Sequence, residues 1–367
     1  MHIQLAREEF LDALAQIQGV IETKKSLPIL SHLLLETRGG LITLSGTDLD
    51  VSIQTSLPGD VKKEGAIAVS AKKLYEIVRE LPDAPIDLRW DANHQIEILC
   101  AKASFRLKAI AKEEFPSLPQ VPEKAGFTIT ADLLRKMIQK TLFAVSTDQT
   151  RPTLTGALLQ MSETDVKMVA TDGHRLSLVI APSGAVKGGG AIEALIPRKA
   201  LVELGKMLRE EGGEVRVVSL DQQVAFLCGK NLLTTRLLEG QFPNYQQVLP
   251  TPSGPGATLS RDGLLGALRR TSTIVGDRAT PTILEMKQGR LLISCTNIDL
   301  GEAREELPME YRGQELTVGF NARYLMDFLN VVEGGEVSIH VHDPLSPALF
   351  EPRKGEGFCC VIMPMRI

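Results

Sequence analysis

The sequence is poor in aromatic residues and cysteines, and each shortage excludes a class of protein. Aromatic residues make up 4% of the chain, with a single Trp, so we expect aliphatic cores and no aromatic platforms for stacked bases. The number of cysteines is odd and two are adjacent, which argues against a disulfide framework. All five lie in apolar, strand-like segments and are typical of reduced thiols in the core of a cytosolic protein: Cys100, Cys228, Cys295, Cys359 and Cys360.

Long apolar runs and a basic leader are also lacking. No stretch approaches the roughly 20 apolar residues that a membrane-spanning helix needs. The segment from Met1 to Glu9 is acidic where a signal peptide would be basic. We therefore expect a cytoplasmic protein with no membrane partner. The formal net charge is −4, which by itself argues against a nucleic-acid partner.

The chain contains one sequence pattern that is repeated three times. Its first landmark, Thr47-Asp48, returns as Thr171-Asp172 and Thr296-Asn297, at steps of 124 and 125 residues. A second landmark recurs at nearly the same step, 127 and 124 residues, and consists of Lys72-Lys73-Leu74, Lys199-Ala200-Leu201 and Arg323-Tyr324-Leu325. A third joins the first two copies only, as Leu99-Cys100-Ala-Lys102 and Leu227-Cys228-Gly-Lys230. A period of this length is a whole domain, because solenoid repeats span only about 20–50 residues.

Two proline-rich stretches separate the copies, at residues 115–124 and 249–257. Their proline content predicts stiff, extended connectors. A Phe-Pro pair stands at or before each of them, at Phe115-Pro116 and Phe242-Pro243. Since domains commonly span about 100–150 residues, we predict three domains over residues 1–120, 127–248 and 256–367.

Each copy is predicted to contain two helices among strands, which makes the fold class α+β. The first helices are expected at residues 7–21, 130–144 and 260–275, and the second at 70–81, 197–210 and 321–333. Candidate N-caps are Ser70, Thr130, Ser260 and Asn321, and Pro197 suits a first helical turn. Strands alternate polar and apolar residues, as in Glu336-Val-Ser-Ile-His-Val341.

Positive charge is concentrated on four of these helices. On the helix at 130–144, an outward face opposite the apolar one is predicted to hold Arg135, Lys136, Gln139 and Lys140. The four helical segments together carry +7, so the rest of the chain carries −11. One interpretation is that amphipathic helices ordinarily have charged outer faces. The other is that these helices face a polyanion and contact its phosphates, independently of sequence and in a salt-sensitive way.

Three segments carry a specific resemblance: Ala170-Thr-Asp-Gly-His-Arg-Leu-Ser177, Phe242-Pro-Asn-Tyr245 and Val361-Ile-Met-Pro-Met-Arg-Ile367. Here, and in register over its whole length, the chain resembles the bacterial replicative sliding clamp, the beta subunit of DNA polymerase III. The resemblance implies a DNA clamp fold of three repeated domains, each with two helices and antiparallel sheets. Two such chains would close head to tail into a ring, with helices lining the hole and sheets forming the rim.

The family binds short peptide tails of its partners in a groove between the second and third domains. In that groove, apolar side chains would form an adaptable floor, and His174 and Arg175 would stand at the rim for polar or carboxylate groups. Where the family often has an arginine, this chain has Gln247, so one polar contact would be weakened. The groove residues implied by the resemblance are Leu154, Thr171, Gly173, His174, Arg175, Leu176, Pro243, Val248, Ile362, Met363, Pro364, Met365 and Arg366.

The resemblance also implies DNA contacts and a dimer interface. DNA contacts would involve Lys24, Lys72 and the pair Arg198-Lys199. The loop at 148–153 lacks the family's tyrosine, so Arg151 is its expected contributor. Closure of the ring would place Phe105 of one chain against Ile274 and Val275 of the next, as a closed two-fold assembly requires.

Together these features predict a processivity factor without catalytic activity of its own. It would encircle duplex DNA as a homodimer and tether replicative and repair polymerases, and other proteins, through their short peptides. No cofactor and no metal are expected. Since the chain has no nucleotide-binding motif, a separate ATP-driven clamp loader would open the ring.

Other interpretations rest on single motifs. Asp172 and His174 suggest a catalytic pair, but no nucleophile accompanies them. His340 and His342 share one face of a strand, yet Asp343 is the only further metal-ligand type nearby. The loop Gly188-Gly-Gly190 is not followed by the GK[ST] of a phosphate-binding loop. An oligomeric enzyme would need a carboxylate or metal set confined to one repeat, and a clamp paralogue insensitive to drugs remains open.

Overall fold

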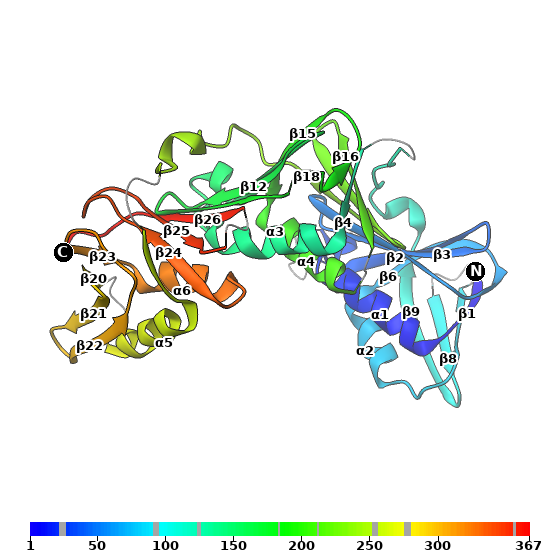
Figure 1. The fold of residues 1–367 in the computed structure, drawn as a ribbon. Coiled ribbons are helices and arrows are strands. Elements are labelled where there is room, and N and C mark those ends of the chain that lie inside the picture. The colour runs from blue at the N-terminus through cyan, green and yellow to red at the C-terminus, as the bar shows by residue number, and fades with distance from the viewer. Residues whose placement is uncertain are drawn as a thin grey trace. The chain divides into compact units, whose positions relative to one another are not determined.

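The computed structural model describes residues 1–21, 27–90, 95–122, 126–182, 184–210, 213–251, 256–274, 280–354 and 357–367 (Figure 1). The chain forms two compact units. The first comprises residues 1–135, 186–190 and 199–237, and the second comprises residues 136–185, 191–198 and 238–367. The second repeat therefore contributes to both units.

The first unit is built on one antiparallel sheet of 14 strands in the order β14-β10-β16-β17-β18-β4-β3-β2-β6-β9-β8-β7-β1-β5. Its central joint is the pairing of β18 with β4, which sets Leu233 opposite Ile53 and joins the second repeat to the first. The strands are β1 (His2–Leu5), β2 (His32–Arg38), β3 (Leu41–Thr47), β4 (Val51–Leu57), β5 (Asp60–Lys63), β6 (Gly65–Ser70), β7 (Ile86–Trp90), β8 (Gln95–Cys100), β9 (Ala103–Ile110), β10 (Phe127–Thr130), β14 (Val186–Lys187), β16 (Glu214–Leu220), β17 (Gln223–Cys228) and β18 (Asn231–Arg236).

The second unit has an eight-stranded sheet, β15-β11-β12-β13-β26-β25-β24-β19, and a four-stranded sheet, β22-β21-β20-β23. In the larger sheet β13 pairs with β26, which sets Leu176 opposite Val361 and joins the second repeat to the third. The strands are β11 (Gly156–Ser162), β12 (Val166–Thr171), β13 (Arg175–Ile180), β15 (Ala191–Pro197), β19 (Ala257–Ser260), β20 (Thr282–Lys287), β21 (Arg290–Asn297), β22 (Gly301–Pro308), β23 (Leu316–Phe320), β24 (Glu336–His340), β25 (Ala348–Pro352) and β26 (Phe358–Ile362).

The six predicted helices are confirmed, each shorter than expected by one or more residues. They are α1 (Arg7–Gln18), α2 (Ala71–Glu80), α3 (Ala131–Thr141), α4 (Arg198–Glu210), α5 (Arg261–Thr271) and α6 (Ala322–Val331). The predicted ends after α3 and α5 are short 3₁₀ turns, η3 (Leu142–Ala144) and η6 (Ser272–Ile274). In Figure 1, α1 lies beside α2 in the first unit and α5 beside α6 in the second.

The N-cap predictions hold at three of the four polar positions. Ser260 accepts a hydrogen bond from the backbone N of Gly263 (3.2 Å), and Asn321 from Arg323 (2.9 Å). Thr130 accepts a longer one from Leu133 (3.4 Å). Ser70 is at the N-cap of α2 but makes no capping bond with its side chain. Pro197 ends strand β15 rather than starting the first turn of α4, because it is still paired with Gly156 of β11 in the sheet.

The predicted outward face of α3 was wrong at one residue. Lys140 is only 8% exposed, and its Nζ lies 5.2 Å above the centre of the Phe358 ring. This ring comes from β26 of the third repeat, so the pattern within α3 could not reveal it. A cation over an aromatic face is attracted by the ring quadrupole, which makes the buried position tolerable for an ammonium group.

The scarce aromatic residues are gathered in the cores. Six phenylalanines are less than 2% exposed: Phe10, Phe127, Phe226, Phe320, Phe328 and Phe350. In the third repeat, Phe350 contacts Phe320 at a ring-centre distance of 5.6 Å and Phe328 at 6.0 Å. The expectation of purely aliphatic packing was therefore wrong for this repeat, although leucine, isoleucine and valine dominate the other cores.

The cysteines are free thiols in the structure, and four of the five are buried. Cys359 is half-buried, and burial raises the pKa of its thiol to about 11. Burial raises the pKa of Cys360 further. None of the helices in the described ranges is both long and apolar enough to cross a membrane.

Each Thr-Asp or Thr-Asn landmark forms the same turn between two strands. The side-chain Oδ1 of the Asp or Asn accepts hydrogen bonds from two backbone N–H groups that follow it, at 2.7–3.2 Å. The turns lie between β3 and β4, between β12 and β13, and between β21 and β22. The repeated sequence is thus a repeated local structure, because the short Asp or Asn side chain can replace a backbone acceptor in a turn.

Candidate functional site

A small apolar cavity of about 180 Å³ opens on the eight-stranded sheet of the second unit. Four segments line it: η4 (Pro152–Leu154), the turn from β12 into β13, the segment 243–248 and the end of β26. The lining residues are Leu154, Thr171, Gly173, His174, Arg175, Leu176, Pro243, Asn244, Tyr245, Val248, Val361 and Met363. We call this cavity the groove.

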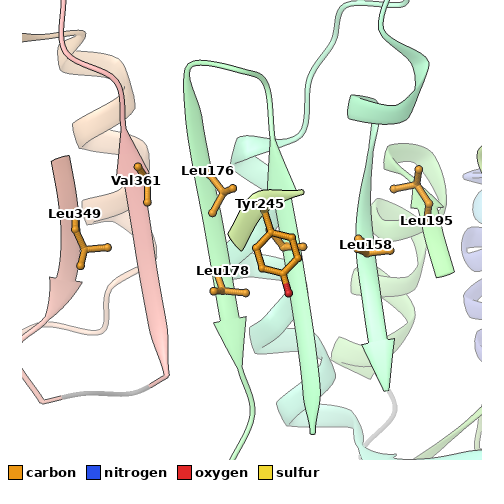
Figure 2. Packing of buried hydrophobic residues seen from close by; sticks show 8 residues of the cluster. Leu158, Leu176, Leu178, Leu195, Tyr245, Leu349 and Val361 are labelled. Atoms are coloured by element: carbon orange, nitrogen blue, oxygen red, sulfur yellow. The ribbon is translucent and has the colours of Figure 1, made fainter. Parts of the chain in front are cut away.

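A buried apolar cluster on one face of the sheet supports the groove, and its members Leu176, Tyr245 and Val361 form the floor. The cluster contains Leu158, Val169, Leu176, Leu178, Leu195, Tyr245, Leu349 and Val361. Figure 2 shows the ring of Tyr245 in front of β12, beside the strand that carries Leu176 and Leu178. The ring is 7% exposed, and its hydroxyl donates a hydrogen bond to Gln160 Oε1 at 3.1 Å. The hydroxyl is thereby satisfied, so the aromatic ring can complete an otherwise aliphatic floor.

The rim leaves apolar surface open to solvent. Val248 is 47% exposed and Met363 is 40% exposed. Met363 is held in place because its backbone N donates to the carbonyl of His174 at 2.9 Å. An apolar depression with exposed apolar edges and few polar groups is how extended peptides are commonly held.

Arg175 lines the groove but does not stand at its rim, where it was predicted. Its side chain is only 9% exposed. Its Nε donates to Asp172 Oδ2 at 3.0 Å, and its two terminal nitrogens donate to Asp327 Oδ2 (2.6 Å) and to the carbonyl of Phe143 (2.5 Å). The guanidinium is thus engaged by its own chain, and a bound carboxylate would have to displace one of these partners.

The structure places the remaining groove candidates elsewhere. Ile362 is fully buried and neighbours Val361 on β26, so the alternation of the strand points it to the opposite face. Beyond Met363, the chain runs to β23, where Met365 N donates to the carbonyl of Gly319 at 2.8 Å. Pro364, Met365 and Arg366 do not line the groove. Asn244, Tyr245 and Val361 do, and the motif Phe242-Pro-Asn-Tyr245 was the signal that could have added two of them.

Comparison with known proteins gives one consistent result. Models for the N-terminal, central and C-terminal domains of the DNA polymerase III beta subunit match residues 1–119, 128–244 and 246–366. The beta sliding clamp of Caulobacter vibrioides is 33% identical over 375 residues and is covered completely, as is this chain. The chain belongs to the DNA polymerase III beta subunit family.

Solved structures of beta sliding clamps have the same fold. The clamp of Bartonella birtlesii, bound to griselimycin, has a TM-score of 0.94 at 33% identity, with 100% of both chains covered. A clamp of Caulobacter crescentus, with polyethylene glycol in a region proposed to tether beta-motifs, has a TM-score of 0.94 at 33% identity. The match covers 100% of this chain and 99% of that one. The predicted three-domain clamp fold of class α+β is confirmed, and sliding clamps are non-catalytic processivity factors.

The residues predicted to contact DNA are divided between the two units. Lys72 is exposed on α2, 3.9 Å from Glu76, and Lys24 lies outside the described residues. Lys199, on α4, forms an ion pair with Asp48. Arg198 is exposed and donates to the carbonyl of Leu142 at 2.9 Å.

Arg151 belongs to the loop whose sequence departs from the family pattern. Its Nε lies 3.0 Å from Asp148 Oδ2. Hydrogen bonds from Thr150, followed by the one from Arg151, hold the pKa of the Asp148 carboxyl below its usual range. Arg151 and Arg198 line a larger, polar cavity of about 580 Å³ with Asp327, Arg323 and Arg175. The loop is thus tied to itself and contributes a cation to a polar cavity.

Two of the three predicted interface residues are described. Phe105 is 39% exposed on β9, and Ile274 is half-buried at the end of η6. Val275 lies outside the described residues. The exposed ring of Phe105 is on a strand whose outer edge, from residue 103 to 108, has no strand partner within the described ranges.

The motifs that suggested other chemistry have structural roles. Asp172 accepts its hydrogen bonds from the backbone of His174 and Arg175 and from the Arg175 side chain. His340 Nε2 lies 3.2 Å from Glu351 across neighbouring strands. Among the residues that the structure describes, no three side chains of His, Cys, Asp or Glu are grouped so as to hold a metal ion.

Proposed function

We propose that this protein acts as a processivity clamp. Two chains close head to tail into a ring around duplex DNA, and the groove tethers replicative and repair polymerases and other proteins by their short peptides. A separate ATP-driven loader opens the ring, and the protein works in the cytoplasm without a cofactor. The three domains are assigned to residues 1–120, 127–248 and 256–367.

The observation that carries the ring is a strand pairing that occurs twice and calls for a third. In the first repeat the strand after the Thr-Asp turn, β4, pairs with β18 of the second repeat. In the second repeat the equivalent strand, β13, pairs with β26 of the third repeat. The equivalent strand of the third repeat, β22, is an edge strand. Its counterpart would be β9, the first repeat's equivalent of β18, in a second chain.

The two free edges are complementary in charge and in apolar character. Strand β22 carries Glu302, Glu305 and Glu306 against one cation, Arg304, whereas β9 carries Arg106 and Lys108 and no acid. The exposed Phe105 lies on β9, and η6, which ends at Ile274, packs against β22. Opposite charges on facing strands favour pairing, and a contact that repeats at both ends of two chains closes the assembly.

Contact with DNA is assigned to the outer faces of the helices. Lys72 on α2 and Lys199 on α4 occupy equivalent positions in successive repeats, and both are exposed by more than 40% of their side chains. Lys24, Arg151 and Arg198 complete the proposed set. Such contacts with phosphates are independent of base sequence, so a closed ring could slide.

The groove is assigned to partner peptides on the strength of its lining. It offers an apolar floor, two exposed apolar rim residues and the backbone of the Thr171–Arg175 turn. The ligands found in clamps of Bartonella birtlesii and Caulobacter crescentus support a ligand-binding surface in this family. The proposed peptide contacts are the residues that line the groove, while Ile362, Pro364, Met365 and Arg366, which the resemblance also implied, lie outside this lining.

The test is retention on DNA after loading by the clamp loader. We expect the protein to remain on nicked circular DNA and to be released when the circle is cut to a linear form. Equal retention on circles and linear DNA, with release controlled by salt alone, would show an ordinary basic surface and reject the ring. A strain in which this chain is the only clamp separates a main replicative clamp from a paralogue, since only the former supports replication.

A further inference from the structure

The guanidinium of Arg175 is enclosed between two aromatic rings as well as bonded to three partners. Its Cζ lies 4.4 Å from the ring centre of Tyr324 and 5.3 Å from that of Phe143. Asp172, Asp327 and the carbonyl of Phe143 accept its hydrogen bonds. Contacts of this kind are strong because the charge is paired, stacked and largely shielded from water.

These partners belong to three different parts of the second unit. Asp172 is in the turn that precedes β13, Phe143 is in η3 after α3, and Asp327 and Tyr324 are on α6 of the third repeat. Asp327 and Tyr324 do not line the groove. Arg175 thus connects a wall of the groove to a helix on which no groove residue lies.

The wall in question depends on this connection for its position. Residues 171 and 173–176 supply five of the groove's lining residues. Most other hydrogen bonds of the turn stay within it, from backbone N–H groups to Asp172 Oδ1 and from Thr171 to the carbonyl of Arg175. Such bonds shape the turn but cannot fix it against α6. The carbonyl of His174 also accepts from Met363, so a shift of the turn would move the rim as well.

The first repeat has a comparable connection between its turn and the second helix of the next repeat. There the equivalent turn is tied to the second helix of the following repeat directly, by the ion pair between Asp48 and Lys199 of α4. For the turn of the second repeat, the residue equivalent to Lys199 is Arg323 on α6 of the third repeat, which is exposed. The tie to α6 runs instead from Asp172 through Arg175 to Asp327, four residues further along the same helix.

We propose that Asp327, acting through Arg175 and supported by Tyr324, is a positioning residue of the groove and sets its affinity for an extended apolar peptide. The inference rests on the proposed function of the groove. It assigns to Arg175 a role in holding the β12–β13 turn, in place of direct recognition of a ligand carboxylate.

The experiment compares Asp327→Asn, Asp327→Glu and wild type in the full chain by amide hydrogen exchange. The amides to follow are those of His174, Arg175 and Met363, because the turn supplies all their acceptors. Loss of one charged, largely buried bond should accelerate their exchange by about tenfold or more. Asp327→Glu keeps the carboxylate and should restore most of the protection. Arg323→Gln, a change of charge on the same helix that removes none of the hydrogen-bond partners of Arg175, is the matched control and should leave the three amides unchanged.

A second variant and a second measurement keep the test decisive. Arg175→Lys keeps the positive charge but loses the planar guanidinium, whose nitrogens bond three partners at once. It should accelerate the exchange of the same amides even if Asp327→Asn folds poorly. Griselimycin, a ligand of a related clamp, serves as the groove probe. Its affinity should fall about tenfold in Asp327→Asn and recover in Asp327→Glu. Where wild type does not bind this probe, the exchange rates decide alone.

Unchanged exchange at the three amides in both Asp327→Asn and Arg175→Lys would overturn the proposal. So would a general acceleration that includes the 14-stranded sheet and is not rescued by Asp327→Glu, because it would show a merely structural role. Retention on circular DNA is measured separately. Its failure with normal exchange effects would reject the ring function while leaving the positioning role intact.

Discussion

The carboxylate of Asp48 forms an ion pair with the ammonium of Lys199, although 151 residues separate them in the sequence. Asp48 is in the turn of the first repeat, and Lys199 is near the start of the second helix of the second repeat. Both residues belong to landmarks that recur through the chain. Twice a turn of one repeat is connected to the second helix of the next, once through Lys199 and once through Arg175 and Asp327.

The exposed rim of the groove provides the most direct test of peptide binding. In Val248→Asp, a charge would be placed at the edge of an apolar floor, and its desolvation should weaken binding of griselimycin by about tenfold or more. Fluorescence anisotropy with a labelled probe measures the change. Leu41→Asp is the control, since Leu41 is similarly exposed at 52% but lies on β3 of the first repeat. Equal loss of affinity in both variants would contradict the assignment of the groove.

Gly173 is the residue of the turn that tolerates substitution least. Its φ of +91° favours glycine, and a Cβ there would lie 2.7 Å from a terminal nitrogen of Arg151. Gly213 has the same φ, but a Cβ on it would meet nothing within 4 Å. We expect Gly213→Ala to lower the free energy of unfolding by about 1 kcal/mol from backbone strain alone.

In Gly173→Ala, we expect the same strain and, in addition, displacement of Arg151 and a weaker groove. Urea unfolding of the two variants, followed by probe binding, separates the two effects. Identical behaviour of both variants in both measurements would show that the contact with Arg151 has no role.

Closure of the ring should depend on Phe105. In Phe105→Glu, an apolar contact is replaced by a negative charge at an edge proposed to face the acidic strand β22, so the dimer should dissociate to monomers at micromolar concentration. Sedimentation equilibrium gives the mass directly. Leu345→Glu, at a position that is 73% exposed in the third repeat, should remain dimeric. A dimeric Phe105→Glu variant would place the interface elsewhere.

The thiol of Cys359 should react slowly despite its partial exposure. Because burial raises its pKa to about 11, only about one thiol in a thousand is ionised at pH 8, against about a quarter at an ordinary pKa of about 8.5. Alkylation by iodoacetamide should therefore accelerate about tenfold per pH unit between pH 8 and 10. Mass spectrometry of the modified peptide gives the rate. The urea-unfolded chain should react readily at pH 8, and rapid reaction of the folded protein at that pH would contradict the raised pKa.

The sequence allowed the helices and the repeated turns to be predicted because both depend on local interactions. Helices were placed to within a few residues, since caps and apolar spacing are encoded within one segment. The turns could be located because Thr-Asp recurs at a fixed step, and Asp48, Asp172 and Asn297 make the same hydrogen bonds. The errors at Lys140 and Pro197 have the opposite cause: a ring from β26 covers one, and a strand continues through the other.

The groove was predicted in outline from family resemblance, and its interior was not. Once β26 is known to be a strand with one face on the groove, the alternation of its side chains shows that Val361 points toward the groove and Ile362 away from it. Nothing near Arg175 in the sequence indicates Asp327 or Tyr324, which lie about 150 residues away. The guanidinium is buried because the β12–β13 turn, η3 and α6 pack together around it. A local sequence pattern cannot indicate such packing.

By itself, then, the sequence determined the repeat, the class of its elements, the reduced cysteines and the family. These follow from spacing, periodicity and composition, which are properties of a chain read in order. The tertiary structure decided which strands join the repeats, which cations remain exposed and which are held by acids, and what lines the groove. Those outcomes depend on contacts between residues far apart in the chain, where burial and charge pairing are set by partners that only the folded structure brings together.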